Sequence, residues 1–230
     1  MRASTGSCAI FTFKRPWPLR NIEKVPPFVP VVLSTLLAYL IGGLPFGYWF
    51  VRLVSGKDIR TMGSGNIGAT NVQRTAGSKA GIVVLILDIC KGALAVFLAD
   101  VITRHDSAGI ALSAVAVMLG HCYPVFLGFK GGKAVACFIG VFLYLAPLTL
   151  AAITVVFVAT VALSRHISLG SIVGAALFPL ALWLIQSPPQ PILLAALASA
   201  ILIIYRHKAN IERLRQGKEH VFSLKGGKTV

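Results

Sequence analysis

Long apolar blocks alternate with short polar segments along most of the chain. Several of these blocks approach or exceed the roughly 20 residues that a helix needs to cross the hydrocarbon core of a bilayer. They cover residues 28–54, 80–102, 108–127, 134–163, 169–185 and 192–205. The pattern predicts an all-α, polytopic integral membrane protein in which residues 28–230 form a single membrane-embedded domain.

The number of membrane spans depends on the block at residues 134–163. It holds about 30 residues, which is more than one span usually needs. Pro147 lies inside it, and proline breaks a helix because it lacks the N–H group and its ring clashes with the preceding turn. A break at Pro147 predicts about seven spans, whereas an unbroken block predicts six.

The positions of Lys and Arg bear on this choice. With seven spans, the segments 55–79, 128–133 and 164–167 and the C-terminal tail face one side, and the turns on the other side carry only Arg104. Because Lys and Arg gather on cytoplasmic loops, we expect the basic side to be cytoplasmic. The basic extension 1–27, which we expect to be disordered, would then lie outside, against this trend. With six spans, the first loop and the tail would lie on opposite faces.

Composition agrees with a membrane protein and narrows its partners. Hydrophobic residues make up 56% of the chain and charged residues 13%, about half the roughly 25% of a soluble domain. The 22 Lys and Arg outnumber the 7 Asp and Glu, which gives a net charge of +15. Part of this excess follows from membrane topology. The rest favours anionic lipids or small anionic substrates over nucleic acid, because basic loops this short offer a nucleic acid little surface.

The first candidate site is the glycine-rich segment GSGNIGATNVQR, residues 63–74. Its glycines formally match the dinucleotide-binding fingerprint, but an apolar span precedes them where that motif needs a strand, so we reject this interpretation. Glycines let backbone N–H groups converge on an anion, and Ser64, Asn66 and Asn71 add neutral donors. Arg74 can bind a phosphate through two N–H groups. The alternative is a solvated cytoplasmic turn.

The second candidate is GFKGGK, residues 128–133. Gly131 and Gly132 are expected to expose backbone amides, with Lys130 and Lys133 beside them. The segment lacks the Walker spacing, but a helix starting near Lys133 would point its positive N-terminal end at the loop. The alternative is a basic loop that only anchors the next span.

The third candidate is YRHKANIERLRQGKEHVF, residues 205–222, where the last span leaves the membrane. His207 and Asn210 are three residues apart and share a helical face. Arg213 falls on the same side. Glu219 is one of few acidic residues, and we expect it to pair with a basic neighbour and fix the tail.

Two weaker signals come from polar residues within or beside spans. Ser168 could face a polar cavity, although a helix cap or an interhelical hydrogen bond is an equally good explanation. Asp88 and Lys91 are three residues apart on one helical face, so an ion pair is geometrically available. The pair could be structural or could line the mouth of an active site. The four cysteines form no Cys-x-x-Cys pair, which argues against a disulfide framework or a structural zinc.

Together these segments resemble the bacterial PlsY-type acyl-phosphate:glycerol-3-phosphate acyltransferases. Three signatures of that family occur in order, namely GSGNIGATNVQR, GHCYPVFLGFKGGKAVA and NIERLRQGKE, and the similarity extends over about residues 30–222. Two positions differ from the usual pattern: Gly43 stands where serine is common, and Cys137 stands where threonine is common.

The resemblance implies seven membrane helices with the signature loops on the cytoplasmic side of the bacterial inner membrane. It implies transfer of a fatty acyl group from acyl phosphate to glycerol 3-phosphate, giving lysophosphatidic acid and inorganic phosphate for phospholipid biosynthesis. We expect no cofactor and no metal. Catalytic roles fall on Ser64, Arg74, His207 and Asn210. Substrate binding is expected at Gly65, Asn66, Asn71, Lys130, Gly131, Gly132, Lys133 and Ser168.

The expected chemistry must bring two anions together. Their repulsion would cost several kcal/mol in a partly dehydrated site, and two cationic loops on one face relieve it. The chain has no His-x-x-x-x-Asp pair and no G-x-S-x-G elbow. We therefore expect direct attack of the acceptor hydroxyl on the acyl carbonyl, promoted by positioning and charge stabilisation. A substrate phosphate oxygen or His207 would accept the proton.

A membrane transporter of phosphorylated metabolites is the alternative function. Such a protein is expected to carry charges or broken helices near the membrane midplane. Here the polar signatures fall in the predicted loops at one surface, which favours chemistry over transport.

Overall fold

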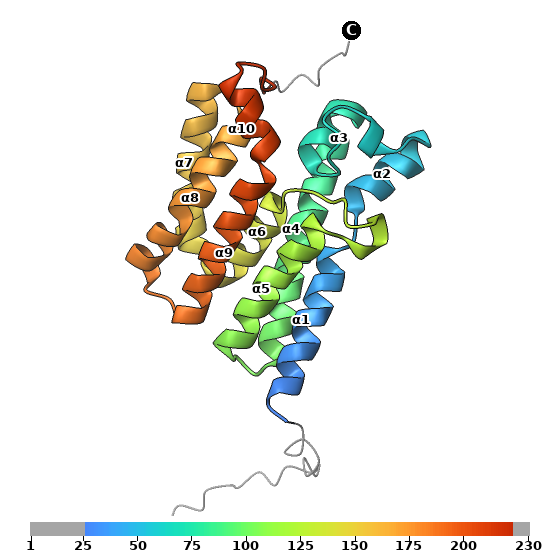
Figure 1. The fold of residues 1–230 in the computed structure, drawn as a ribbon. Helices are drawn as coiled ribbons and strands as arrows, with labels where there is room; N and C mark the ends of the chain where they lie inside the picture. The colour runs from blue at the N-terminus through green and yellow to red at the C-terminus, as the bar shows by residue number, and fades with distance from the viewer. Residues whose placement is uncertain (1–25, 223–230) are drawn as a thin grey trace, which may run out of the picture.

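The computed structural model describes residues 26–222, in which helices are joined by loops and no strand occurs. Residues 1–25, which make up most of the predicted disordered extension, lie outside the described part. The helices are α1 (Phe28–Gly42), α2 (Phe46–Ser55), α3 (Ala69–Ala76), α4 (Ser78–Ile102), α5 (Ser107–Cys122), α6 (Val135–Leu145), α7 (Pro147–Ser164), α8 (Ile167–Gln186), α9 (Gln190–Arg206) and α10 (Lys208–Arg215). Figure 1 shows them as one bundle. The prediction of an all-α membrane protein is confirmed.

Five regions of the described chain are long and apolar enough to cross a membrane, and there are six if α9 and α10, bent by 54° at His207, count as one span. The predicted break at Pro147 is confirmed, because α6 ends at Leu145 and α7 begins at the proline. Proline suits this position because its missing N–H would have no intrahelical partner there. With 11 residues, α6 is about 16 Å long, too short to cross alone. The count of seven spans stays a prediction.

The first apolar block is not one continuous helix. Its helix stops at Gly42, the chain bends through Gly43, Leu44 and Pro45, and α2 continues from Phe46. Pro45 cannot donate a backbone hydrogen bond, and the residue before a proline is steered away from helical geometry. The break leaves the Leu44 carbonyl inside the molecule as a hydrogen-bond acceptor.

The helices pack around α5, which contacts α1, α4 and α9, while α6 packs on α4 and α8 lies between α7 and α9. Phe138 and Phe142 of α6 meet Phe178 of α8 with ring centroids 4.5–4.7 Å apart. Small residues let neighbouring backbones approach closely, as is usual between membrane helices. A Cβ on Gly140 of α6 would overlap the Ile89 carbonyl of α4.

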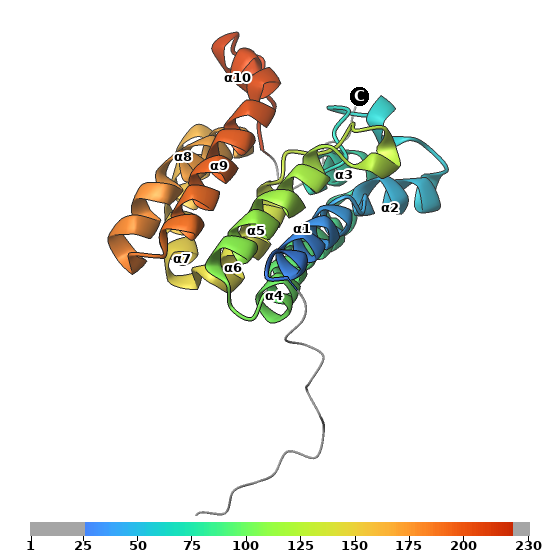
Figure 2. The same cartoon turned by 60° about the horizontal axis from the view of Figure 1, so that its bottom comes forward.

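The alternating direction of the helices places all three signature segments at one end of the bundle. Figures 1 and 2 show α3, the α5–α6 connection and α10 together at this end. We call it the signature end. The turns at 103–106 and 187–189 lie at the other end, where Arg104 is the one Lys or Arg in the described part of the chain. The sequence prediction that residues 63–74 and 128–133 share a face is confirmed.

Close packing of α6 on α4 predicts a sharp cost for a single methyl group. Gly140→Ala should lower the free energy of unfolding by about 1–3 kcal/mol, because the overlap with Ile89 forces the helices apart. Thermal unfolding in detergent would measure this loss. Gly174→Ala is the matched control, since a Cβ there meets only Ile153 Cγ2 at 3.4 Å. It should be neutral or stabilise by up to about 1 kcal/mol through helix propensity, and equal losses in both variants would contradict the packing argument.

Candidate active site

The loop between α2 and α3 is organised by Asn71, whose side chain is buried. Its amide nitrogen donates to the carbonyls of Met62 at 3.0 Å and Asn66 at 2.8 Å, and its oxygen accepts the Ser64 N–H at 2.9 Å. The Asn66 side chain accepts the Gly68 N–H at 2.8 Å. Both asparagines, predicted to bind substrate, therefore use their side chains to shape the loop. The Ser64 hydroxyl forms no hydrogen bond within residues 26–222.

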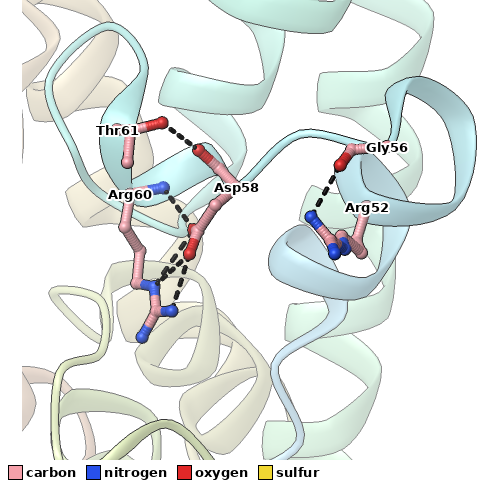
Figure 3. A network of polar contacts seen from close by, with 5 residues as sticks. All are labelled: Arg52, Gly56, Asp58, Arg60 and Thr61. Carbon is pink, nitrogen blue, oxygen red and sulfur yellow. Dashed lines mark hydrogen bonds and ion pairs between the residues drawn. The ribbon is translucent and has the colours of Figure 1, made fainter.

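An ion pair stabilises the start of this loop (Figure 3). Asp58 accepts the backbone N–H of Arg60 at 2.9 Å and its guanidinium at 2.6 Å, while Thr61 donates its hydroxyl to the Asp58 carbonyl at 2.8 Å. The hydrogen bond from Arg60 is the main cause that lowers the pKa of Asp58. On the neighbouring helix end, Arg52 donates to the Gly56 carbonyl at 2.6 Å. These bonds hold the loop in one shape before the glycine-rich segment begins.

The glycine-lysine loop is held by hydrogen bonds on both its edges. The N–H groups of Gly131 and Gly132 donate to the carbonyls of Cys122 at 3.1 Å and His121 at 2.9 Å. The guanidinium of Arg206 donates one hydrogen bond of 3.0 Å to the Gly132 carbonyl and another of 3.0 Å to the Gly131 carbonyl. The sequence predicted that these two amides would be free for a phosphate, and that detail is wrong, because the end of α5 occupies both.

The third signature builds a polar cluster around Glu219. Its carboxylate accepts hydrogen bonds from Asn210 at 2.6 Å, Ser168 at 2.9 Å and Arg213 at 2.7 Å. Burial alone would raise the pKa of Glu219, but these bonds outweigh it and hold the pKa below its ordinary value. Lys133 donates to the other end of the Asn210 side chain. The predicted pairing of Glu219 with a basic neighbour is confirmed, and the cluster joins α8, α10 and the second signature.

Of the predicted catalytic residues, His207 lies at the bend between α9 and α10 with its ring buried. Its Nδ1 is 2.7 Å from the Ile203 carbonyl, a contact that requires a proton on Nδ1. In the neutral ring, Nε2 then carries a lone pair. This nitrogen has no hydrogen-bond partner in the described part of the chain, so it can accept a proton or a hydrogen bond from a substrate.

Arg74 and Lys133 supply the positive charge of the site. Arg74 projects from α3, and within residues 26–222 its guanidinium makes no hydrogen bond or ion pair. Burial lowers the pKa of Lys133 to about 8, and the nearby charges of Arg213, Arg74 and Arg206 add to this effect against the opposing pull of Glu219. Lys133 and its neighbouring arginines thus share the single negative charge of Glu219. An anionic ligand would reduce the repulsion between these cations.

A cavity of about 590 Å³ opens between the first and second signatures. Gly65, Lys130 and Gly131, all predicted to bind substrate, line it together with Arg60 and Arg206; Asp58, Thr61 and Phe129 complete its wall. The structure therefore brings the predicted site residues to one end of the bundle. Gly65, Lys130 and Gly131 line this cavity, and Lys133, Ser168 and Asn210 belong to the Glu219 cluster.

Sequence reasoning missed Arg60 and Arg206 as parts of the site. Arg206 immediately precedes His207, but its contacts with Gly131 and Gly132 join residues 74 and 75 positions apart. No local pattern reports such a contact. In the sequence, only their position beside a signature pointed to these two arginines as site residues. Exposed arginines such as Arg215 share that position, so it could not distinguish them.

Comparisons with known proteins identify a family that this chain matches over most of its length. Residues 32–217 match the family model described as glycerol-3-phosphate acyltransferase. A glycerol-3-phosphate acyltransferase of Jannaschia sp. (strain CCS1) is 50% identical over 188 residues, covering 81% of this chain and 90% of that protein. One of Syntrophotalea carbinolica is 45% identical over 190 residues, covering 83% and 96% respectively.

Two solved structures share the fold. The crystal structure of PlsY, an integral membrane glycerol 3-phosphate acyltransferase, in its glycerol 3-phosphate form, superimposes with a TM-score of 0.79 at 39% identity. Its lysophosphatidic acid form gives a TM-score of 0.76 at 37% identity. Each comparison covers 84% of this chain and 96% of the PlsY chain.

The lowered pKa of Lys133 predicts a pH dependence for anion binding. The ammonium is charged below about pH 8 and neutral above it, so the affinity for inorganic phosphate should fall as the pH rises from 7 to 9. Isothermal titration calorimetry would measure this fall. Lys133→Arg keeps its charge throughout this range and should flatten the profile. An unchanged pH dependence in that variant would assign the titration to another group.

Proposed function

The chain belongs to the glycerol-3-phosphate acyltransferase family, and on that premise we propose that its acyl donor is a fatty acyl phosphate. Glycerol 3-phosphate is the acceptor, and the products are lysophosphatidic acid and inorganic phosphate. The observation that carries the proposal is the convergence of Arg74, Lys133 and Arg213 on the single carboxylate of Glu219. Two phosphates brought to this place would find the charge that offsets their mutual repulsion.

The reaction proceeds by direct transfer. The acceptor hydroxyl oxygen attacks the acyl carbonyl carbon, the bond from this carbon to the phosphate oxygen breaks, and inorganic phosphate leaves. The hydroxyl proton passes to a phosphate oxygen or to Nε2 of His207. Arg74 binds phosphate through two N–H groups, and Lys133 and Ser64 stabilise the charge that develops during attack. Asn210 holds Lys133 in place.

The surroundings of the serines and cysteines support a reaction without a covalent acyl-enzyme. Cys122 and Cys137 are fully buried in the apolar core. Ser168 donates its hydroxyl to the carboxylate of Glu219, and the Ser64 hydroxyl has no basic partner within residues 26–222. Nucleophilic catalysis needs an accessible nucleophile next to an activating base. The buried cysteines lack the access and Ser64 lacks the base. The carboxylate beside Ser168 is already bound by Asn210 and Arg213.

The distribution of basic residues supports a cytoplasmic active site in the bacterial inner membrane. The signature end carries the cationic loops, and the other end carries only Arg104 within the described residues. By the positive-inside tendency, the signature end faces the cytoplasm. Glycerol 3-phosphate then enters from water, while the acyl chain of the donor stays in the bilayer.

A transporter of phosphorylated metabolites is less well supported. It would need polar groups exposed along a path through the membrane. The charged pair deep in α4, Asp88 and Lys91, is only 2% and 3% exposed and is paired within the bundle. It offers no surface to a passing ion.

Donor specificity tests the proposed chemistry. Purified protein in detergent should release inorganic phosphate from acyl phosphate only when glycerol 3-phosphate is present, and acyl-CoA should not replace acyl phosphate. A colorimetric phosphate assay with mass spectrometry of the lipid product measures both. Turnover with acyl-CoA would refute the proposed donor, and an acylated serine or cysteine during turnover would refute direct transfer.

Removing the charge of Arg74 should reduce kcat/KM strongly and change the stability of the fold little. Arg74→Ala should lower kcat/KM by about 100- to 1,000-fold, the usual cost of removing one donor that stabilises developing charge. Arg74→Lys should recover part of the activity, because it restores charge without the two-pronged geometry. Arg215→Ala removes an exposed arginine at the same end and is the control, with activity near that of the parent protein. Similar losses at both positions would mean that only the overall positive field matters.

A further inference from the structure

An Asp–Lys pair is buried in α4, away from the catalytic loops. Lys91 Nζ lies 2.8 Å from Asp88 Oδ1, as the spacing of these residues predicted. The same ammonium donates to the Leu44 carbonyl at 2.8 Å, in the break between α1 and α2. A buried ion pair is costly unless additional hydrogen bonds satisfy it. The break at Leu44 provides one, so the pair ties α4 to the first span.

His121, near the end of α5, lies between this pair and the glycine-lysine loop. Its Nδ1 is 3.8 Å from Asp88 Oδ1 and has no hydrogen-bond partner among the described residues. On the other side of the ring, a Cβ added to Gly132 would overlap Nε2 of the imidazole. The backbone carbonyl of His121 also accepts the Gly132 N–H at 2.9 Å. The loop therefore rests directly on His121.

Gly132 is thus held from two sides. Arg206 binds its carbonyl from α9, and the imidazole of His121 supports it from within the bundle. Lys133 is the next residue, and its ammonium reaches Asn210. A shift of the loop would move this ammonium directly, and a misplacement of about 1 Å in an active site can reduce the rate about 100-fold.

We propose that Asp88, Lys91 and His121 are positioning residues. They fix how far the loop from Gly131 to Lys133 sits into the helix bundle. They act through Gly132 and touch no substrate. The inference rests on the proposed function, in which Lys133 of this loop stabilises the charge that develops during attack on the acyl phosphate. It explains why an otherwise apolar bundle keeps two charges and an imidazole beneath the site.

A metal ion is the competing role for the same residues. Asp88, His121 and Cys137 place a carboxylate oxygen, an imidazole nitrogen and a thiol sulfur within 4.8 Å of one another, and zinc uses these ligand types. The ammonium of Lys91 already binds the carboxylate oxygen. A dication beside it, in a medium of low dielectric constant, would meet strong repulsion, which favours the positioning role.

A double-mutant cycle between His121 and Gly132 tests the contact. His121→Ala should raise KM for acyl phosphate and lower kcat, with a combined loss of kcat/KM of about 10- to 100-fold, while KM for glycerol 3-phosphate changes little. Gly132→Ala should lose more, because its methyl group strikes the imidazole. The double variant should be no worse than His121→Ala alone, since removal of the ring makes room for the methyl group. Losses that multiply would overturn the proposal.

Variants of the ion pair give a second, independent measurement. The neutral double variant Asp88→Asn/Lys91→Met removes both charges and should raise KM for acyl phosphate in the same manner as His121→Ala. An unchanged KM in a folded double variant would overturn the role of the pair, and if this variant does not fold, the His121–Gly132 cycle decides. Ser113→Ala is the control on α5, because Ser113 is buried and its side chain bonds only Ser34, at 3.3 Å, among residues 26–222. The KM for acyl phosphate should not change in this variant.

Two further measurements separate the possible failures. Stoichiometric zinc in the purified protein, lost in Cys137→Ser, would replace the positioning role with a metal site. If the parent protein uses no acyl phosphate, the proposed donor fails. The cycle is then measured through the affinity for inorganic phosphate by calorimetry, where the same rescue of Gly132→Ala by His121→Ala is expected and its absence overturns the inference.

Discussion

Repulsion between like charges is the constraint on which the signature end of this molecule depends. The charges of Arg74, Lys133 and Arg213 repel one another, and all three are attracted to the carboxylate of Glu219. Burial, and after it the neighbouring positive charges, lowers the pKa of Lys133. Such an arrangement is unfavourable in the empty protein and becomes favourable when anions enter. The fold therefore maintains, without substrate, the positive field that the two phosphates of the proposed reaction require.

Maintaining that field requires the cations to be fixed, and the apolar bundle fixes them. In water, lysine and arginine side chains would swing apart. Here Asn210 holds Lys133, Glu219 holds Arg213, and the two glycine carbonyls hold Arg206. The anchors lie in α10, in the segment after it and in the α5–α6 connection, and Ser168 of α8 also bonds Glu219. The site therefore exists only when α8, α9, α10 and the α5–α6 connection are packed together.

The position of the glycine-lysine loop goes together with a short α6. The α5–α6 connection turns back into the bundle to place Gly132 on His121, and α6, from Val135 to Leu145, has only 11 residues. The loop thereby brings the ammonium of Lys133 within hydrogen-bond reach of Asn210 in α10.

Local patterns in the sequence predicted whatever depends on neighbouring residues. Hydrophobic blocks predicted the long apolar helices, Pro147 predicted the break before α7, and the spacing of Asp88 and Lys91 predicted their ion pair. Contacts between distant segments lay beyond such patterns. The glycines of the second signature looked suited to expose their amides, yet the carbonyls of His121 and Cys122 occupy them, and glycine is needed at position 132 because an imidazole lies against it. A glycine motif thus indicates that another group lies close to the backbone. Only the fold shows which group this is.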